Sequence, residues 1–269
     1  MTQSDKAYTG SIPAFYDRYL GPMLFRPYAA DIAARAMAFA PLTVLETAAG
    51  TGIVTARLAE VLADDARITA TDLNQAMIDV GAAKVNSPKV KWRACDATRL
   101  PFADGSFDLV LCQFGIMFFP SKLDAFKEAR RVLRPGGKFL FNVWDRIELN
   151  PFPLTVADAI AALYSVDPPN YPRRTPYGHH DVETIKNQLV EAGFRTIEFV
   201  VVTLPTSCPS AGDAAIAQLH GSPMRIEIEA RDPTGLEAAT DAVEAALAAR
   251  FGDGPIESTM QAIVFTAAG

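Results

Sequence analysis

A short run of residues near the start of the chain combines an acidic side chain with a glycine turn. The run reads Val44-Leu45-Glu46-Thr47-Ala48-Ala49-Gly50-Thr51-Gly52-Ile53-Val54-Thr55. Its apolar start predicts a buried strand with Glu46 at the end, and the two glycines allow a sharp turn into a helix. Free N–H groups at such a helix start, with no Cβ in the way, suit the polar end of a nucleotide-like cofactor.

The spacing of the small residues bears on which cofactor this is. A dinucleotide site needs G-x-G-x-x-G, whose third small residue allows helix and strand to pack closely. Here Thr55 stands at that third position, and Glu46 would place a carboxylate beside the pyrophosphate, where charge repulsion is unfavourable. A cationic ligand would instead be favoured, so an NAD(P)-dependent oxidoreductase is the less favoured alternative.

A second acidic residue follows at a distance typical of ribose recognition. Arg67–Asp72 reads as a strand, and Asp72 at its end could accept hydrogen bonds from both ribose hydroxyls. The alternative is that Asp72 only caps the helix expected over 74–84. NAD sites share this feature, so Asp72 indicates a ribose without identifying the cofactor.

The next segments resemble a known family. A third strand ends near Asp96, and it is followed by Leu100-Pro101-Phe102, a fourth strand Ser106–Cys112, and then Arg131-Val132-Leu133-Arg134-Pro135-Gly136-Gly137 before a fifth strand to Trp144. The glycine loop resembles motif I of class I S-adenosylmethionine-dependent methyltransferases, with Ala48 in place of the first glycine. The later series resembles the UbiE-like, type 11 methyltransferases nearly residue for residue. The resemblance is strong over residues 11–146 and holds in outline beyond.

The resemblance implies an α/β fold. We expect a Rossmann-like seven-stranded sheet, mostly parallel with the last strand antiparallel at the sheet edge, flanked by helices and carrying helical lid insertions. Later elements are expected at 181–192 (helix), 195–203 (sixth strand), 211–220 and 236–251 (helices) and 260–266 (seventh strand). A single domain, 1–269, would comprise an N-terminal helical lid (1–40), a cofactor-binding core (41–146) and substrate-cap insertions (147–180 and 205–255).

The resemblance also implies site residues, with S-adenosyl-L-methionine as cofactor and S-adenosyl-L-homocysteine as product. Glu46 would hold the methionyl amino group, Asp72 the ribose, and Asp96 with Ala97 the adenine. Alternatives are that Met77 and Tyr19 are packing residues and that Gln113 only satisfies buried backbone groups. The expected cofactor residues are Tyr16, Glu46, Ala48, Gly50, Gly52, Asp72, Leu73, Met77, Asp96, Ala97 and Gln113; the expected substrate residues are Tyr19, Phe114, Met117, Phe118 and His179.

Composition limits the partners. The chain has 269 residues and a net charge of −6, which argues against broad binding to nucleic acid or anionic membranes. Arg130, Arg131 and Arg134 cluster, but a solvated helix end is the favoured explanation. The sequence shows no signal-type or membrane-spanning run, so a soluble cytoplasmic protein without stable membrane insertion is expected. The 3 cysteines lack metal-ligand spacing, and no metal is expected.

The chemistry of methyl transfer explains why no catalytic residue stands out. Displacement at a sulfonium methyl is accelerated by alignment in a dry site, and a general base helps only when the acceptor is a hydroxyl. His179, His180 and His220 are candidates, although capping or solvent exposure explains the first two more simply. The aromatic residues after the fourth strand predict a small or medium apolar acceptor, such as a quinone-, lipid- or secondary-metabolite-like molecule; the alternative is that these aromatic residues only pack the core. A non-catalytic S-adenosylmethionine-binding or interaction protein is the alternative.

Overall fold

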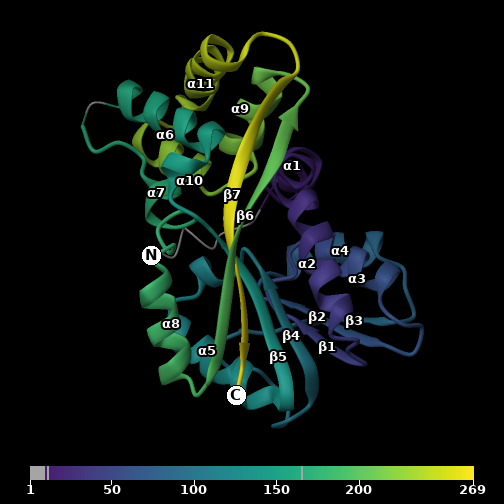
Figure 1. Cartoon of the computed structure of the whole chain (residues 1–269). Coiled ribbons are helices and arrows are strands. Elements are labelled where there is room, and N and C mark those ends of the chain that lie inside the picture. Colours follow the sequence, from purple (N-terminus) through teal and green to yellow (C-terminus); the bar gives the residue numbers. More distant parts are fainter. Residues whose placement is uncertain (1–9, 11, 165) are drawn as a thin grey trace. The chain divides into compact units, whose positions relative to one another are not determined.

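The computed structural model describes residue 10 and residues 12–164 and 166–269, and the strands of these residues form one seven-stranded sheet (Figure 1). The sheet order is β3-β2-β1-β4-β5-β7-β6. The strands are β1 (Thr43–Glu46), β2 (Arg67–Asp72), β3 (Val90–Ala94), β4 (Phe107–Gln113), β5 (Leu133–Trp144), β6 (Thr196–Cys208) and β7 (Ile256–Ala268).

Strands β1 to β5 pair in parallel. Strand β7 is antiparallel to its neighbour β6, since Arg195 N, just before β6, donates to the backbone oxygen of Ala268 at the end of β7, at 2.8 Å. The expected Rossmann-like fold class is therefore confirmed. The edge position expected for the last strand is wrong, because β7 lies between β5 and β6. The apolar residues of β7 around Phe265 are buried, whereas Phe199 of β6 is 47% exposed, as suits an edge strand.

The chain divides into two compact units, each described here by itself. The sheet unit comprises residues 28–143, 180–202 and 262–269. One face of its sheet carries an apolar cluster that includes Ile32, Val44, Leu58, Leu111 and Leu140. The other face is aromatic, with Phe126 and Phe139 in contact at 5.8 Å between ring centroids. Its helices are most of α2 (Arg26–Ala38), α3 (Ile53–Val61), α4 (Gln75–Lys84), η3 (Ile116–Phe118), α5 (Lys122–Val132) and α8 (Val182–Glu191).

The helical unit comprises the described residues of 1–27, 144–179 and 203–261. Helix α11 packs on both α6 and α9, with Phe152 edge-on to Phe251 at 4.8 Å. The described residues of 147–179 and all of 205–255, that is, the proposed cap segments apart from residue 180, belong to this unit, and their role as a cap stays a prediction. Its helices are α1 (Ile12–Phe15), η2 (Tyr16–Phe25), η4 (Ile147–Leu149), α6 (Pro151–Leu163), α7 (Tyr171–Arg174), α9 (Ala211–His220), α10 (Met224–Arg231) and α11 (Leu236–Phe251).

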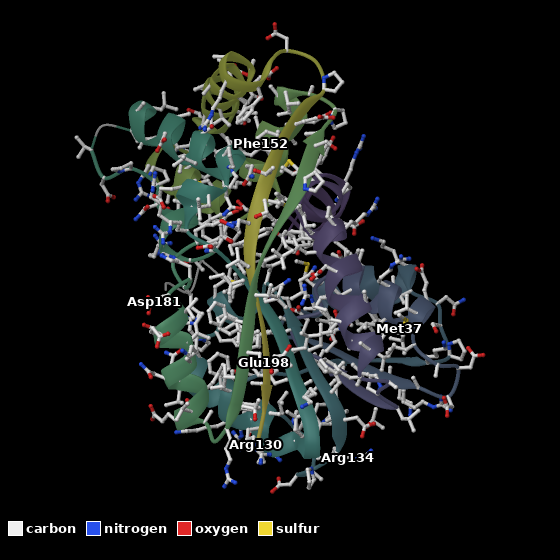
Figure 2. All side chains as sticks on the ribbon, viewed as in Figure 1. Met37, Arg130, Arg134, Phe152, Asp181 and Glu198 are labelled. Atoms are coloured by element: carbon white, nitrogen blue, oxygen red, sulfur yellow. The ribbon has the colours of Figure 1, made fainter. Side chains whose placement is uncertain are left out.

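The arginines near the end of α5 are held by acidic neighbours. Arg131 pairs with Glu128 and Asp104, each at 2.7 Å, and Arg134 pairs with Asp108 at 2.8 Å. Figure 2 shows Arg130 and Arg134 at one end of the sheet unit. Because Arg134 pairs with Asp108, near the start of β4, this end of the sheet is opposite to the carboxyl end of β4. These pairs are those expected at the charged end of an exposed helix.

Gly81 on α4 brings that helix against the ring of Trp92 on β3. A Cβ at Gly81 would lie 2.5 Å from Trp92 Cη2, closer than van der Waals contact allows. We expect Gly81→Ala to lower the free energy of unfolding by about 1–3 kcal/mol, despite the higher helix propensity of alanine. Urea denaturation measures this, and in a Trp92→Leu background the same change should cost much less. A more stable Gly81→Ala protein would contradict the packing described.

Candidate cofactor site

Glu46 is a buried carboxylate at the carboxyl end of β1. It is 2% exposed, and its Oε2 accepts a hydrogen bond from Thr55 Oγ1 at 2.7 Å. Burial raises the pKa of Glu46 from 4.5 to about 8, opposed by the Thr55 bond and increased further by Asp72. None of the described basic side chains pairs with it. A carboxylate buried without a cation fits a ligand that brings a positive charge.

The glycine loop after Glu46 adopts a left-handed backbone at three alternate positions. The φ angles are +53° at Ala48, +56° at Gly50 and +81° at Gly52. Glycine adopts this conformation without steric cost, whereas alanine does so less readily, which explains the usual glycine at the place of Ala48. Gly52 directly precedes α3, and its position at the start of the helix makes no side-chain cap hydrogen bond, so the first N–H groups of α3 lack a side-chain partner there and suit the polar end of a ligand.

Asp72, at the end of β2, connects the glycine loop to the start of helix α4 through its two carboxylate oxygens. Its Oδ2 accepts from Gly50 N at 2.9 Å, and its Oδ1 accepts from Asn74 N at 2.8 Å, just before α4. The carboxylate is 8% exposed, and burial raises its pKa. Asp72 thus accepts from the backbone N of Asn74, the residue that caps α4, and does not itself cap the helix. Its position at the end of β2 is the one expected for ribose binding, and that role stays a prediction. Leu73 is 52% exposed and Met77 is buried.

The loop after β3 brings Asp96 and Ala97 to the same edge of the sheet. Cys95 N donates to the backbone carbonyl oxygen of Asp72 at 3.0 Å, which ties this loop to the end of β2. Asp96 is exposed, and its Oδ1 accepts from the backbone N and hydroxyl of Thr98, at 2.8 and 2.7 Å. These bonds hold the carboxylate in one orientation, with Ala97 half-buried beside it.

The end of β4 presents the predicted acceptor residues. Gln113 is half-buried, Phe114 and Met117 are buried, and Phe118 is half-buried. Phe114 has a φ of +50°, and its ring meets Tyr28 edge-on at 5.2 Å. Lys122 Nζ donates to the backbone oxygens of Met117 and Phe119, which holds the turn η3 in place. The sheet unit therefore brings together Glu46, the glycine loop, Asp72, Asp96 and this apolar segment at one edge.

Three predicted residues belong to the helical unit instead. Tyr16 stacks on Phe25 at 4.9 Å, and Tyr19 stacks on Phe15 at 5.9 Å. His179 is half-buried. The packing alternative for Tyr19 therefore agrees with its contacts, and the ligand roles of these residues stay predictions.

Three residues at the site were missed in the sequence. Thr55 was noted only as a misfit in a dinucleotide motif, yet it holds Glu46. Gly115 packs against Ala48, and a Cβ there would lie 2.5 Å from the Ala48 Cβ. Asn142 is buried at the end of β5. Asn142 could have been identified in the sequence as the single amide side chain within the otherwise apolar run from Phe139 to Trp144.

Neither a metal-binding group nor a membrane-spanning helix is found among the described residues. These residues contain no group of three or more histidine, cysteine, aspartate or glutamate side chains arranged to hold a metal ion. Their helices are all too short or too polar to cross a membrane.

Comparison with known proteins supports the chemistry of this site. Residues 45–141 match the family model described as a methyltransferase domain. The chain is 30% identical to the ubiquinone/menaquinone biosynthesis C-methyltransferase UbiE of Shewanella woodyi, over 60% of this chain and 70% of that protein. Its fold is similar to that of YcgJ from Bacillus subtilis (TM-score 0.58, 16% identity, 88% of this chain and 97% of that one). It is also similar to an S-adenosylmethionine-dependent methyltransferase from Aquifex aeolicus (TM-score 0.52, 16% identity, 71% and 90%).

The chain belongs to the class I S-adenosylmethionine-dependent methyltransferases of the UbiE-like type. It is an enzyme, and its cofactor is S-adenosylmethionine. The buried Glu46 carboxylate, with no cationic partner among the described side chains, and the start of α3 after Gly52, with no side-chain cap, fit a cationic nucleoside cofactor.

The contact between Gly115 and Ala48 makes the cofactor loop sensitive to one methyl group. In Gly115→Ala the new Cβ would meet Ala48 Cβ at 2.5 Å and Cys112 Sγ at 2.7 Å, so the loop must move. We expect S-adenosylmethionine affinity to fall about tenfold or more, since a small displacement of a positioned loop is costly. Calorimetry measures the loss. The double variant Gly115→Ala/Ala48→Gly should recover part of the affinity, since it relieves the contact with Ala48 but not that with Cys112 Sγ, and an additive second loss would contradict this explanation.

Proposed function

We propose that the enzyme methylates a small or medium apolar organic acceptor, and that a quinone-like aromatic molecule is the favoured class. The observation that carries this proposal is the apolar segment of Phe114, Met117 and Phe118 at the carboxyl end of β4, beside the strand that ends in Glu46. Ligands of open α/β sheets bind at this edge. The similarity to the UbiE C-methyltransferase of Shewanella woodyi, named for ubiquinone and menaquinone biosynthesis, supports the quinone-like class.

Within this proposal each predicted cofactor residue of the sheet unit has a role. Glu46 accepts from the amino group of the cofactor, and Thr55 orients its carboxylate. Asp72 accepts from the ribose hydroxyls while it holds Gly50. Asp96 and the Ala97 N–H bind the adenine, with Leu73 and Met77 beside it. Gln113 contacts the reacting end, and Tyr16 from the helical unit is a further proposed cofactor residue.

The cofactor supplies a methyl group activated by its positively charged sulfur. The chain contributes orientation and exclusion of water, since in-line displacement needs the acceptor atom, methyl carbon and sulfur aligned. The buried side chains of Phe114 and Met117 would pack against an apolar acceptor, hold its reacting atom in line with the methyl carbon and sulfur, and exclude water. Tyr19, Phe118 and His179 are the remaining proposed acceptor contacts.

The acceptor class can be tested by product formation. Purified enzyme with S-adenosylmethionine is incubated with 2-prenyl-1,4-naphthoquinol, oleate or phosphoethanolamine, and S-adenosylhomocysteine is quantified. We expect turnover with the naphthoquinol at least about tenfold above that with phosphoethanolamine, because an apolar pocket gains free energy from apolar area and pays to desolvate a zwitterion. Methylation of phosphoethanolamine alone, or of protein or RNA alone, would refute the proposed class.

A further inference from the structure

Asn142 at the end of β5 has no role in the site as described so far. It is fully buried within an apolar stretch of its strand. In the pairing of β4 with β5 it lies opposite Gln113, and the preceding pair on the same face is Leu111 with Leu140, both in the apolar cluster. The Gln113 and Asn142 side chains therefore project from one face of the sheet. A buried amide is costly unless both of its ends have hydrogen-bond partners.

One end of this amide has a partner. Phe114 N donates to Asn142 Oδ1 at 2.9 Å, and also to the Asn142 backbone oxygen at 3.3 Å. Because a backbone N–H can only donate, the atom that faces it must be the amide oxygen, which assigns the orientation of the group. The bond supports the left-handed backbone of Phe114, an unusual conformation for a bulky residue.

The other end of the amide lacks a partner. Asn142 Nδ2 is buried, and no atom of the described residues accepts its hydrogen bonds. An unsatisfied buried donor loses its hydrogen bonds to water without replacement, and native proteins keep such groups where a ligand or water completes them. The donor thus points to a binding partner that the chain itself does not provide.

The place of Asn142 in the sheet indicates which ligand it serves. The sheet order runs β2-β1-β4-β5, with Asp72 ending β2, Glu46 near the end of β1 and Asn142 near the end of β5. Neighbouring strands lie about 4.8 Å apart, so β5 is about 10 Å from β1, on the other side of β4. A cofactor held at β1 and β2 leaves the ends of β4 and β5 for the acceptor.

We propose that Asn142 binds the methyl acceptor by donating a hydrogen bond from Nδ2 to an oxygen atom of that molecule. This inference rests on the proposed function and narrows it: the acceptor carries a carbonyl or hydroxyl oxygen beside its apolar body. Asn142 then has two tasks, since its Oδ1 holds the Phe114 turn while its Nδ2 orients the acceptor.

Two ligands that differ by one oxygen test this inference without requiring turnover. The enzyme loaded with S-adenosylhomocysteine is titrated with 1-tetralone, which has one ketone oxygen, and with tetralin, which has none. We expect the wild type to bind 1-tetralone at least about fivefold more tightly, as one added hydrogen bond to a buried donor predicts. In Asn142→Leu, which removes the donor at similar volume, the two affinities should become equal.

The variant Asn142→Asp separates the two tasks. An aspartate still accepts from Phe114 N, so the turn is kept, and thermal unfolding checks this. A protonated aspartate donates as the amide does, whereas an ionised one repels the ketone oxygen. We expect the preference for 1-tetralone to be present near pH 5 and lost near pH 8.5. A residue that only supports the turn would show no such pH profile.

The possible results distinguish the inference from the proposed function. If the wild type binds both ligands but its preference for the ketone survives in Asn142→Leu, the donor role is wrong and the proposed acceptor class stands. If the wild type binds tetralin and 1-tetralone equally, the donor role is also wrong. If neither ligand binds to an enzyme that binds S-adenosylhomocysteine, the apolar acceptor site itself is refuted, and the inference fails with it.

Discussion

Asp72→Ala is expected to weaken S-adenosylmethionine binding by about 100-fold or more. The substitution removes the carboxylate proposed to accept from both ribose hydroxyls, and hydrogen bonds to charged groups contribute about 1.5–3 kcal/mol each. It also removes the acceptor for Gly50 N, at 2.9 Å, so the glycine loop loses one of its supports. Titration calorimetry on protein stripped of carried-over ligand measures the change.

The matched control for this variant is Asp79→Ala. Asp79 is an exposed acid on α4 whose Oδ1 accepts from Gln75 Nε2 within its own helix, at 2.7 Å. Its loss should leave the affinity within about twofold, since such surface contacts contribute little. An Asp72→Ala protein that folds and keeps wild-type affinity would show that Asp72 only supports the start of α4.

Glu46 should make the stability of the unliganded enzyme fall as pH rises. The pKa of Glu46 is raised from 4.5 to about 8 by burial, so the folded protein keeps a proton that the unfolded chain releases between these values. Its contribution is fully present below pH 4.5 and is lost as pH rises through 8. At about 1.4 kcal/mol per pKa unit, the loss is at most about 5 kcal/mol. Urea denaturation from pH 5 to pH 9 measures it.

In Glu46→Gln this part of the pH dependence should disappear, so the variant gains stability relative to the wild type as pH rises to 9. It should also bind S-adenosylmethionine at least about tenfold more weakly, since a neutral amide lacks the charge that pairs with the amino group. Thr55→Val is the companion variant, because it removes only the 2.7 Å bond that lowers this pKa. Parallel pH profiles for wild type and Glu46→Gln would contradict the buried, protonated state of Glu46.

Strand-end acids and the glycine turn were predictable because each depends on short local patterns. Glu46 and Asp72 stand where apolar runs end, and parallel strands bring such residues to one edge. Helices α9 and α11 were also predicted with their observed bounds, since each is a long amphipathic or alanine-rich segment. Helix α10 was missed because its sequence, MRIEIEAR, alternates apolar and charged residues as a strand does.

Partners distant in sequence could not be read from local patterns. The bond from Thr55 to Glu46 depends on how α3 packs over β1, and the contact of Gly115 with Ala48 depends on the order of β1 and β4. The position of β7 inside the sheet likewise depends on whether β6 or β7 pairs with β5, which is decided by packing between segments distant in the sequence. Periodicity identifies a strand but does not determine its neighbours.

The most direct test of the cofactor assignment is a titration of the stripped wild-type enzyme with S-adenosylmethionine, S-adenosylhomocysteine and NADH, each repeated on Asp72→Ala. The structure and the family predict micromolar binding of both sulfur ligands, loss of that binding in the variant, and no binding of NADH. Preferential binding of NADH, or no binding of either sulfur ligand by folded wild-type protein, would contradict the assignment of this site.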